Sequence, residues 1–251
     1  MLEFPNASYT GSMHIGGVAW DPHTGLITII TDSAAPWATG GADVSGDHFL
    51  IKYHPHQKKI IWSLNITDLT QERYGGFQDV ETDRRGNTYV VGTWPGTILR
   101  ADRHGRSIKN WYLPEPLPPT TKVGFGGLVA VGGTSEVLLA NDGDGQLYRF
   151  DMRHEVGTPV LVPVTSGVAC RINDAIYLPP RYDGRVLLVA CGAEGLQVLR
   201  SRDKRWVTAE YLGTVPNPTG PGFEGSVVTA AVQIGRNPGS IHLVEGYFDF
   251  P

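Results

Sequence analysis

Three short stretches decide the fold: GTILRAD at residues 96–102, GQLYRFD at residues 145–151 and GLQVLRS at residues 195–201. In each stretch a glycine opens a short run of strand-forming residues. The three glycines lie 49 and 50 residues apart, which is close to the length of the repeating units of β-propellers. The spacing therefore predicts a chain built from copies of one unit.

Each copy holds four strand-like runs. In the copy that contains the first stretch, these runs are 78–82, 88–92, 97–101 and 107–113, and turn residues separate them. Four antiparallel strands per unit, with no convincing helical periodicity anywhere, predict an all-β fold, a β-propeller of four-stranded antiparallel blades. A β-sandwich is the alternative, but sandwiches rarely keep so even a spacing.

The predicted blades make a single domain over residues 1–251. Four are complete and a fifth is partial, and their approximate ranges are 15–66, 75–113, 125–164, 172–215 and 224–251. Residues 1–10 are predicted to form a closing or orphan outer strand. Propellers often complete one blade from both termini, so the chain could form five blades, or most of a six-bladed ring that lacks a blade upstream.

The composition limits the kinds of partner that the protein is expected to bind. The formal net charge is −4 and the acids and bases are interspersed, so no basic stripe is present for nucleic acid and no polybasic segment for a membrane surface. No apolar run approaches the ~20 residues that span a bilayer, and residues 1–10 carry no export signal. We expect a monomer whose partner is a hydrophobic small molecule.

Two features bear on the cellular compartment. The only cysteines, Cys170 and Cys191, flank a predicted hairpin, so a disulfide and a pair of buried thiols are both open. Two N-x-S/T sequons, at Asn6 and Asn65, are glycosylation candidates if the protein enters a secretory pathway.

The candidate site follows from propeller geometry. The loops that enter the first strand of each blade and those that join the second and third strands gather on one face, and the Lys- and Arg-rich turns fall on the other. The polar candidates on the first face are His14, Gln78, Asp79, Asn173, Asp174 and Glu224. The aromatic candidates are Trp37, Tyr74, Phe77, Trp94, Phe125 and Phe223. Aromatic walls around a few convergent polar groups are typical of a small-molecule site. Each residue also has a structural reading, as a cap, a turn residue or packing between blades.

Other motifs give weaker evidence of function. The stretch NDGDG at residues 141–145 resembles the start of a calcium loop, but position twelve is Met152 or Arg153 instead of the bidentate Glu, so a tight turn is predicted. No G-x-S-x-G or H-E-x-x-H motif is present, which leaves ordinary serine-hydrolase and zinc-protease chemistry unsupported.

At GGVAWDPHTGLITIITDSA, RYGGFQDVETDRRGNTYVVGTWPGTILR and GFEGSVVTA the chain resembles a fungal family of six-bladed, TolB-like propellers found in secondary-metabolite clusters. That family includes the accessory protein of trichothecene clusters and the hetero-Diels–Alderases of tropolonic sesquiterpene biosynthesis. The resemblance runs along nearly the whole chain and is most specific around residues 75–100. It implies a longer N-terminus with a signal peptide and a further blade, and hence a secretory route.

Three functions follow from the resemblance. In the first, the aromatic residues enclose a terpenoid or polyketide intermediate, and groups such as His14 or Gln78 polarise an oxygen during cyclisation or hetero-Diels–Alder coupling, without a cofactor. In the second, a more distant resemblance to gluconolactonase, regucalcin and paraoxonase propellers implies a lactonase with calcium or another divalent cation on Asp79, Asn173 and Glu224. The third is a non-catalytic binding propeller.

Overall fold

The structure is a computed structural model that describes residues 13–165, 170, 173–221, 223–235 and 240–246. Residues 1–125 with 155–157 form one compact unit, unit 1, and residues 126–154 with 158–251 form another, unit 2. Each unit has its own sheets and its own core. The predicted strand at residues 1–10 and the sequon at Asn6 lie outside the described residues, and the single domain over residues 1–251 stays a prediction.

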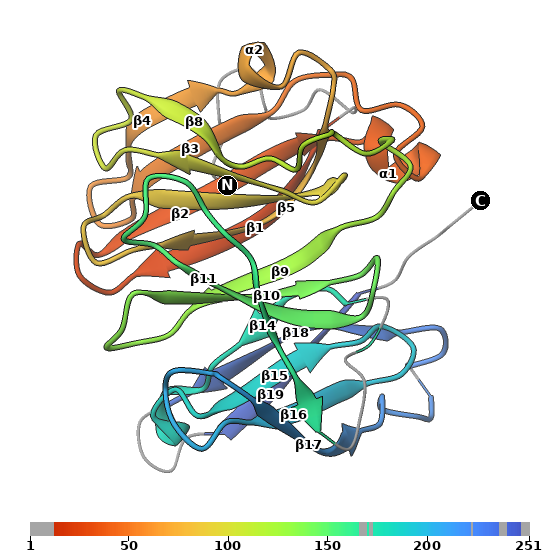
Figure 1. Ribbon diagram of the computed structural model, residues 1–251. Helices are drawn as coiled ribbons and strands as arrows, with labels where there is room; N and C mark the ends of the chain where they lie inside the picture. Colours follow the sequence, from red (N-terminus) through yellow and green to blue (C-terminus); the bar gives the residue numbers. More distant parts are fainter. Residues whose placement is uncertain (1–12, 166–169, 171–172, 222, 236–239, 247–251) are drawn as a thin grey trace. The chain divides into compact units, whose positions relative to one another are not determined.

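Unit 1 contains two four-stranded sheets in which neighbouring strands follow one another along the chain and pair antiparallel (Figure 1). The strands of the first are β1 (Met13–Asp21), β2 (Leu26–Ser33), β3 (Phe49–His54) and β4 (Lys59–Asn65). Those of the second are β5 (Gly75–Thr82), β6 (Thr88–Trp94), β7 (Thr97–Ala101) and β8 (Ile108–Tyr112).

Unit 2 repeats the arrangement. Its first sheet consists of β9 (Phe125–Ala130), which begins at the last residue of unit 1, with β10 (Glu136–Asn141), β11 (Gln146–Asp151) and β12 (Val160–Val162). Its second sheet consists of β14 (Ile176–Tyr177), β15 (Val186–Ala190), β16 (Leu196–Arg200) and β17 (Ala209–Val215), with β13 (Val164–Thr165) added outside β17. The last pair of strands is β18 (Val227–Ile234) and β19 (Ser240–Gly246).

The predicted all-β fold of four-stranded antiparallel sheets is therefore confirmed. The three repeated glycines each lie one residue before the third strand of a sheet, β7, β11 and β16. Gly145 and Gly195 adopt positive φ angles of 66° and 97°, a region that favours glycine because it has no Cβ atom. The repeat thus marks the turn that enters each third strand.

Burial explains why the sequence periodicity is uneven. Every residue of β6 is buried, because this strand lies between two others and is covered on both faces. The outer strand β4 instead alternates exposed and half-buried positions, the two-residue period expected of a strand with one solvent face. Burial is thus continuous along β6 and alternates along β4.

Apolar side chains join neighbouring sheets within each unit. In unit 1, Ile30 and Leu50 of the first sheet share a core with Val80, Val90 and Leu99 of the second. In unit 2, one core joins the sheets that contain β10 and β15, and another joins β15 and β16 to β18. Burial of these faces, at roughly 25 cal/mol per Å² of apolar surface, is what stacks one sheet on the next.

A buried cation also joins the two sheets of unit 1. The Lys52 Nζ on β3 donates to Thr28 Oγ1 on β2 at 2.7 Å and to Thr82 Oγ1 on β5 at 3.2 Å. Burial lowers the pKa of Lys52, and the nearby carboxylates of Asp21, Glu81 and Asp83 oppose that shift. Two hydroxyls and the surrounding negative charge compensate the desolvation of the amine.

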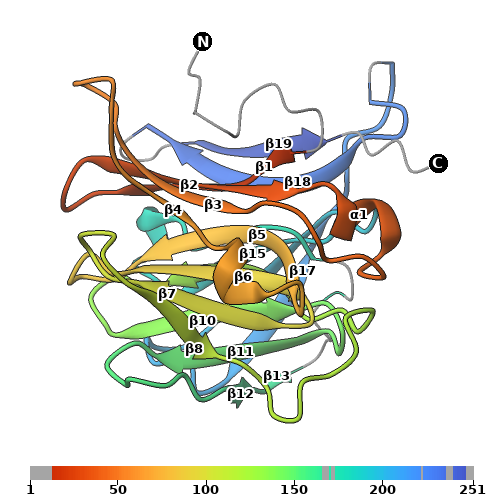
Figure 2. The same ribbon diagram turned by 90° about the horizontal axis from the view of Figure 1, so that it is seen from above.

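Two features extend the sequence prediction. Two short helices, α1 (Ala35–Thr39) and α2 (Thr67–Thr70), were not predicted, because one turn is too short to show a helical period. The strand β13 pairs parallel with β17 and follows β12 after the single residue Pro163, as Figure 2 shows for the segment from β12 to β13. Among the described residues no helix is long and apolar enough to cross a membrane.

Candidate functional site

An aromatic cluster in unit 1 brings together three of the predicted residues. Trp37 lies in α1, within the insertion between β2 and β3, and its ring centroid is 4.5 Å from that of Trp94 at the end of β6. The His14 ring of β1 lies 5.7 Å from the Trp37 ring on another side. Both contacts are edge-to-face, the arrangement that aromatic rings favour. His14 and Trp37 are half-buried, so the cluster has a solvent-accessible side.

A buried polar pair, which the sequence analysis did not identify, fixes the position of Trp37. The indole Nε1 of Trp37 donates to Asp32 Oδ2 at 2.9 Å, and the other carboxylate oxygen contacts Nδ1 of His48. The side chains of Asp32 and His48 are fully buried. Because the carboxylate binds both partners, the orientation of the indole is set by groups on β2 and just before β3. The His48 Nε2 has no hydrogen-bond partner among the described residues.

The protonation state of His14 follows from its surroundings. Burial lowers the pKa of His14, and the negative charge of Asp32, its pairing neighbour on β2, acts in the opposite direction. The net direction is downward from an ordinary value of 6.5, which favours the neutral imidazole at pH 7. A neutral imidazole can donate one hydrogen bond and accept another.

Two glycines make room for the Trp94 indole. A Cβ atom at Gly76 would lie 2.2 Å from Trp94 Cε3, and one at Gly41 would lie 2.5 Å from Trp94 Cδ1. Both glycines also have positive φ angles, so a larger residue would be strained as well as crowded. The Trp94 Nε1 is buried and has no partner among the described residues, which leaves one donor available beside Trp37.

Gln78 and Asp79 lie on β5 against the backbone of β1. A Cβ atom at Gly16 would lie 2.3 Å from Phe77 O, and one at Gly17 would lie 2.7 Å from Asp79 Cα, so the glycine pair allows the two inner strands to meet. The ladders β1–β2 and β5–β6 are both irregular at these positions. Such bulges re-aim side chains and are common near functional sites.

Both of these polar side chains have partners. The Thr93 hydroxyl lies 3.0 Å from Gln78 Oε1 and 2.9 Å from Phe125 O, and so is shared between the two oxygens. Asp79 Oδ1 accepts the backbone N–H of Val80 at 2.8 Å. The structural role that the sequence left open for each is therefore present.

Unit 2 contains the equivalent junction, with Asn173 and Asp174 before β14. A Cβ atom at Gly126 would lie 2.4 Å from Asn173 Oδ1, and one at Gly127 would lie 2.6 Å from Asp174 O. Here the polar side chain lacks partners: Asn173 is 3% exposed, and neither its Oδ1 nor its Nδ2 has a hydrogen-bond partner among the described residues.

Asp142, which the sequence analysis assigned to a tight turn, lies next to Asn173. Its Oδ1 accepts the backbone N–H of Asn173 at 2.7 Å. Burial is the main cause that raises the pKa of Asp142 to about 7, the Asp174 carboxylate raises it further, and the hydrogen bond from Asn173 opposes the shift. The signal in the sequence was the turn NDGDG between the second and third strands, on the face already expected to hold the site.

The two cysteines form a disulfide with a Cα–Cα distance of 5.7 Å. Cys191 directly follows β15, and Cys170 lies three residues before Asn173. Of the two alternatives that the sequence left open, the structure has the disulfide. The bridge ties Cys170 to the residue that follows β15.

The remaining predicted residues do not join the His14–Trp37–Trp94 cluster, although the Phe77 ring packs edge-on against His48 with their centroids 5.1 Å apart. Tyr74 and Phe77 are fully buried in the core of unit 1, and Tyr74 donates to Asn110 Oδ1 at 2.5 Å, so neither presents a surface to a ligand. Phe125 is 3% exposed and packs against Tyr112. Phe223 is 41% exposed and, like the exposed Glu224, belongs to a turn of unit 2.

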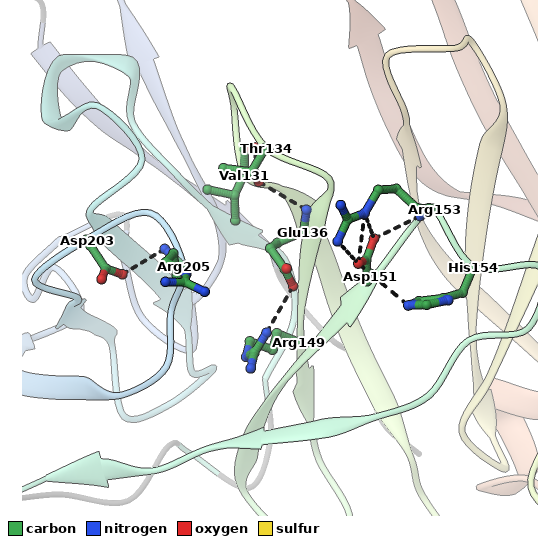
Figure 3. A network of polar contacts seen from close by, with 9 residues as sticks. All are labelled: Val131, Thr134, Glu136, Arg149, Asp151, Arg153, His154, Asp203 and Arg205. Carbon is green, nitrogen blue, oxygen red and sulfur yellow. Dashed lines mark hydrogen bonds and ion pairs between the residues drawn. The ribbon is translucent and has the colours of Figure 1, made fainter.

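Charged side chains elsewhere form ion pairs with one another. Figure 3 shows one such network in unit 2, where Arg153 and His154 contact the carboxylate of Asp151, and Arg149 lies 3.4 Å from Glu136. Hydrogen bonds from Arg153 lower the pKa of Asp151. These ion pairs link β10, β11 and the turn that follows β11.

Among the residues that the structure describes, no three His, Cys, Asp or Glu side chains are arranged as a metal-binding group. Of the residues implied for a cation by the distant resemblance, Asp79 accepts the Val80 N–H, Asn173 is buried and Glu224 is exposed.

Comparison with solved structures places the fold among the propellers. The crystal structure of the major Malassezia sympodialis allergen Mala s 1 superimposes with a TM-score of 0.80 at 18% identity, over 99% of this chain and 77% of that one. The β-propeller domain of Cps50 (Swd1) from Myceliophteria thermophila gives a TM-score of 0.51 at 12% identity, over 80% of this chain and 59% of that one. At these identities the likeness concerns the fold alone.

Sequence comparison identifies the family. The chain is 32% identical to trichothecene biosynthesis protein 14 of Trichoderma arundinaceum over 264 aligned residues, which cover 99% of this chain and 70% of the relative. It is 29% identical to core trichothecene cluster protein 14 of Fusarium sporotrichioides, over 86% of this chain and 60% of that relative's length. No protein-family model matches the sequence. The chain belongs to the family of trichothecene biosynthesis protein 14, a family of fungal secondary-metabolite biosynthesis.

Proposed function

We propose that the chain binds a hydrophobic terpenoid or polyketide intermediate of a fungal secondary-metabolite pathway and promotes its cyclisation or hetero-Diels–Alder coupling. The observation that carries the proposal is the cluster of His14, Trp37 and Trp94 in unit 1. It combines a half-exposed aromatic surface with a neutral imidazole and a buried indole N–H that has no partner among the described residues. Family membership supports the class of pathway.

The side chains of this cluster suit a cyclisation reaction. Aromatic faces bind flat or polycyclic apolar ligands and add a directional contribution of about 0.5–1.5 kcal/mol per ring pair beyond burial. A cyclisation needs its reacting carbons held in a near-attack arrangement, from which an enzyme can gain several of the ~7–11 kcal/mol that orientation offers. His14 would donate to a carbonyl or quinone-methide oxygen as negative charge develops on it.

The Asp32–His48 pair has a positioning role in this proposal. It fixes the indole of Trp37 through the 2.9 Å hydrogen bond, so the aromatic surface is already formed before a ligand binds. A preorganised surface loses less conformational entropy on binding than a mobile one.

The test is product analysis in a fungal host whose own copy of the gene is deleted and replaced by variants. Trp37→Ala and His14→Phe, which keeps a ring but removes the donor, are expected to lower the pathway product at least tenfold. The matched control is Trp20→Ala, which removes a 53% exposed tryptophan of the same unit, on the strand that carries His14. Trp37→Phe keeps an aromatic ring and should retain part of the function.

Product levels that stay unchanged in Trp37→Ala and His14→Phe would refute the proposal. The metal-dependent lactonase alternative predicts a different result: product formation by the purified protein would then require a divalent cation and stop with EDTA, whereas we expect no effect of chelator. A non-catalytic binding protein would bind the intermediate without converting it.

A further inference from the structure

A glycosylation sequon lies at the outer edge of the first sheet of unit 1. It consists of Asn65, Ile66 and Thr67, and its middle residue is not proline. We propose that Asn65 carries an N-linked oligosaccharide, which shields the open edge of β4 from other polypeptides. The site is separate from the aromatic cluster and independent of the reaction proposed for that cluster.

The acceptor amide of the sequon is accessible. Asn65 is the last residue of β4 and is exposed. Its Oδ1 accepts the backbone N–H of Thr67 at 2.9 Å, whereas its Nδ2 has no hydrogen-bond partner among the residues that the structure describes. A sugar attached to Nδ2 therefore displaces no contact within the described part of the fold.

The residue between Asn65 and Thr67 holds the sequon at the surface. Ile66 is fully buried in the core of unit 1, and its backbone N–H donates to His48 O at 3.0 Å. The chain then enters α2 at Thr67, and Figure 1 shows β4 leading into this helix. Because Ile66 is anchored in the core, its two neighbours remain on the solvent side of the chain.

The disulfide of unit 2 indicates a compartment in which the sequon can be used. Cys170 and Cys191 are the only cysteines of the chain, and they are bonded to each other. Disulfides form and persist in oxidising compartments and are rare in the cytosol. N-glycosylation is likewise a modification of proteins that enter the secretory pathway. Two independent features, one in each unit, therefore favour the same route.

The position of Asn65 gives the oligosaccharide a role. β4 is the outermost strand of its sheet and, among the described residues, pairs only with β3. The same strand has an apolar side chain in solvent, since Ile61 is 43% exposed. An open edge of this kind is a template for the addition of a foreign strand. A bulky, hydrophilic group at the end of β4 obstructs that approach.

Both polar residues of the sequon also have structural roles. The Thr67 hydroxyl accepts the backbone N–H of His48 at 3.1 Å and lies 3.4 Å from Asp47 Oδ1. Asn65 closes a turn through its Oδ1, a role that aspartate fills equally well. Asn65→Asp therefore separates the two roles, because it keeps the turn and removes the acceptor nitrogen.

The group transfer needs one co-reactant, an oligosaccharide carried on a polyprenyl diphosphate. The Asn65 Nδ2 forms a bond to the anomeric carbon of the first sugar and loses one proton. The bond from that carbon to the diphosphate oxygen breaks, and the diphosphate leaves with the electron pair. No group is oxidised or reduced.

The experiment is glycopeptide mass spectrometry on the full chain isolated from the fungus that produces it. Trypsin releases residues 60–73, which contain a single asparagine, Asn65. Treatment with peptide N-glycanase in H₂¹⁸O should convert this asparagine to ¹⁸O-labelled aspartate. Asn65→Asp should abolish the glycan on this peptide, and Thr67→Ser, which keeps the hydroxyl, should retain it. Residues 110–122 form the control peptide, whose single asparagine, Asn110, lies outside any sequon and should stay unlabelled.

A second measurement tests the shielding of β4. In an Asn6→Gln background, endoglycosidase H trims the glycan to one sugar on Asn65 and changes no charge of the protein. Light scattering should then show severalfold faster aggregation than before trimming. Recovery of residues 60–73 from the native protein entirely in the unmodified form would overturn the glycan. Equal aggregation rates before and after trimming would overturn its shielding role.

Discussion

The glycine junctions of the two units use the same packing but differ in their polar groups. In unit 1, Gly16 and Gly17 lie against Gln78 and Asp79; in unit 2, Gly126 and Gly127 lie against Asn173 and Asp174. Gln78 shares the Thr93 hydroxyl, whereas the amide of Asn173 has no partner among the described residues. The same packing therefore satisfies the polar side chain in one copy and leaves a buried amide unsatisfied in the other.

The largest expected effect tests the shared packing. Gly16→Ala and Gly126→Ala should each destabilise the protein by about 3 kcal/mol, because the new methyl group would overlap Phe77 O or Asn173 Oδ1. Gly132→Ala is the control, since nothing lies within 4 Å of its Cβ position. Urea denaturation measures all three. A loss below about 1 kcal/mol in both junction variants would mean that the strands do not need this close approach.

The next-largest loss of stability is expected in unit 2. Among the described residues, only its junction lies near a disulfide. Replacing both Cys170 and Cys191 by Ser should lower stability by about 2–3 kcal/mol, as the bridge closes a separation of 21 residues. Hydrogen exchange at the Asn173 N–H should accelerate much more than at the Val80 N–H of unit 1. Equal acceleration at both positions would contradict a local anchoring role.

Through Asp142, the junction of unit 2 should make the free energy of unfolding depend on pH, by about 2 kcal/mol. The pKa of Asp142 is raised in the folded state from 3.8 to about 7, so the folded protein binds the extra proton between these values. Its contribution to stability is present below about pH 4 and is lost as the pH rises to 7. At about 1.4 kcal/mol per pKa unit the shift sets an upper limit near 4 kcal/mol, which partial solvent exposure reduces.

Denaturant unfolding at pH 5 and pH 8 measures this effect. Asp142→Asn should flatten the difference between the two pH values relative to the wild type. Asp144→Asn should leave it intact. If Asp142→Asn keeps the full pH dependence, the proton is bound elsewhere.

The smallest expected changes in stability compare the polar side chains of the two junctions directly. Gln78→Leu should cost about 1 kcal/mol because it removes a hydrogen-bond partner of Thr93. Asn173→Leu should be neutral or stabilise the protein by about 1 kcal/mol, since it removes an amide without partners. Thermal melts of the two variants measure the opposite signs. A clear loss in Asn173→Leu would show that its amide has a partner in solution.

The sequence was sufficient for the strands and for the location of the junctions. The runs 97–101 and 227–234 coincide with β7 and β18, because glycine turns and strand-forming residues bound them on both sides. The polar pairs at 78–79 and 173–174 were found because they recur at the same point of the repeat. Propeller geometry and local chemistry determine both.

The sequence was insufficient where the outcome depends on contacts between distant segments. The Asp32–His48 pair joins the two ends of an insertion, and nothing local to either residue marks it. Tyr74 and Phe77 carry the composition of a binding wall, but both side chains face the core between the two sheets of unit 1. The pKa of Asp142 likewise depends on burial and on Asp174, 32 positions away.

The segment from β12 to β13 has a consequence for solubility. It is the outermost strand of one sheet of unit 2 and, after Pro163, it lies along the outermost strand β17 of the next sheet. An open sheet edge is a template on which another polypeptide can add a strand and start aggregation. By pairing Val164 and Thr165 with Ala209 and Glu210, the chain occupies the start of that template on β17.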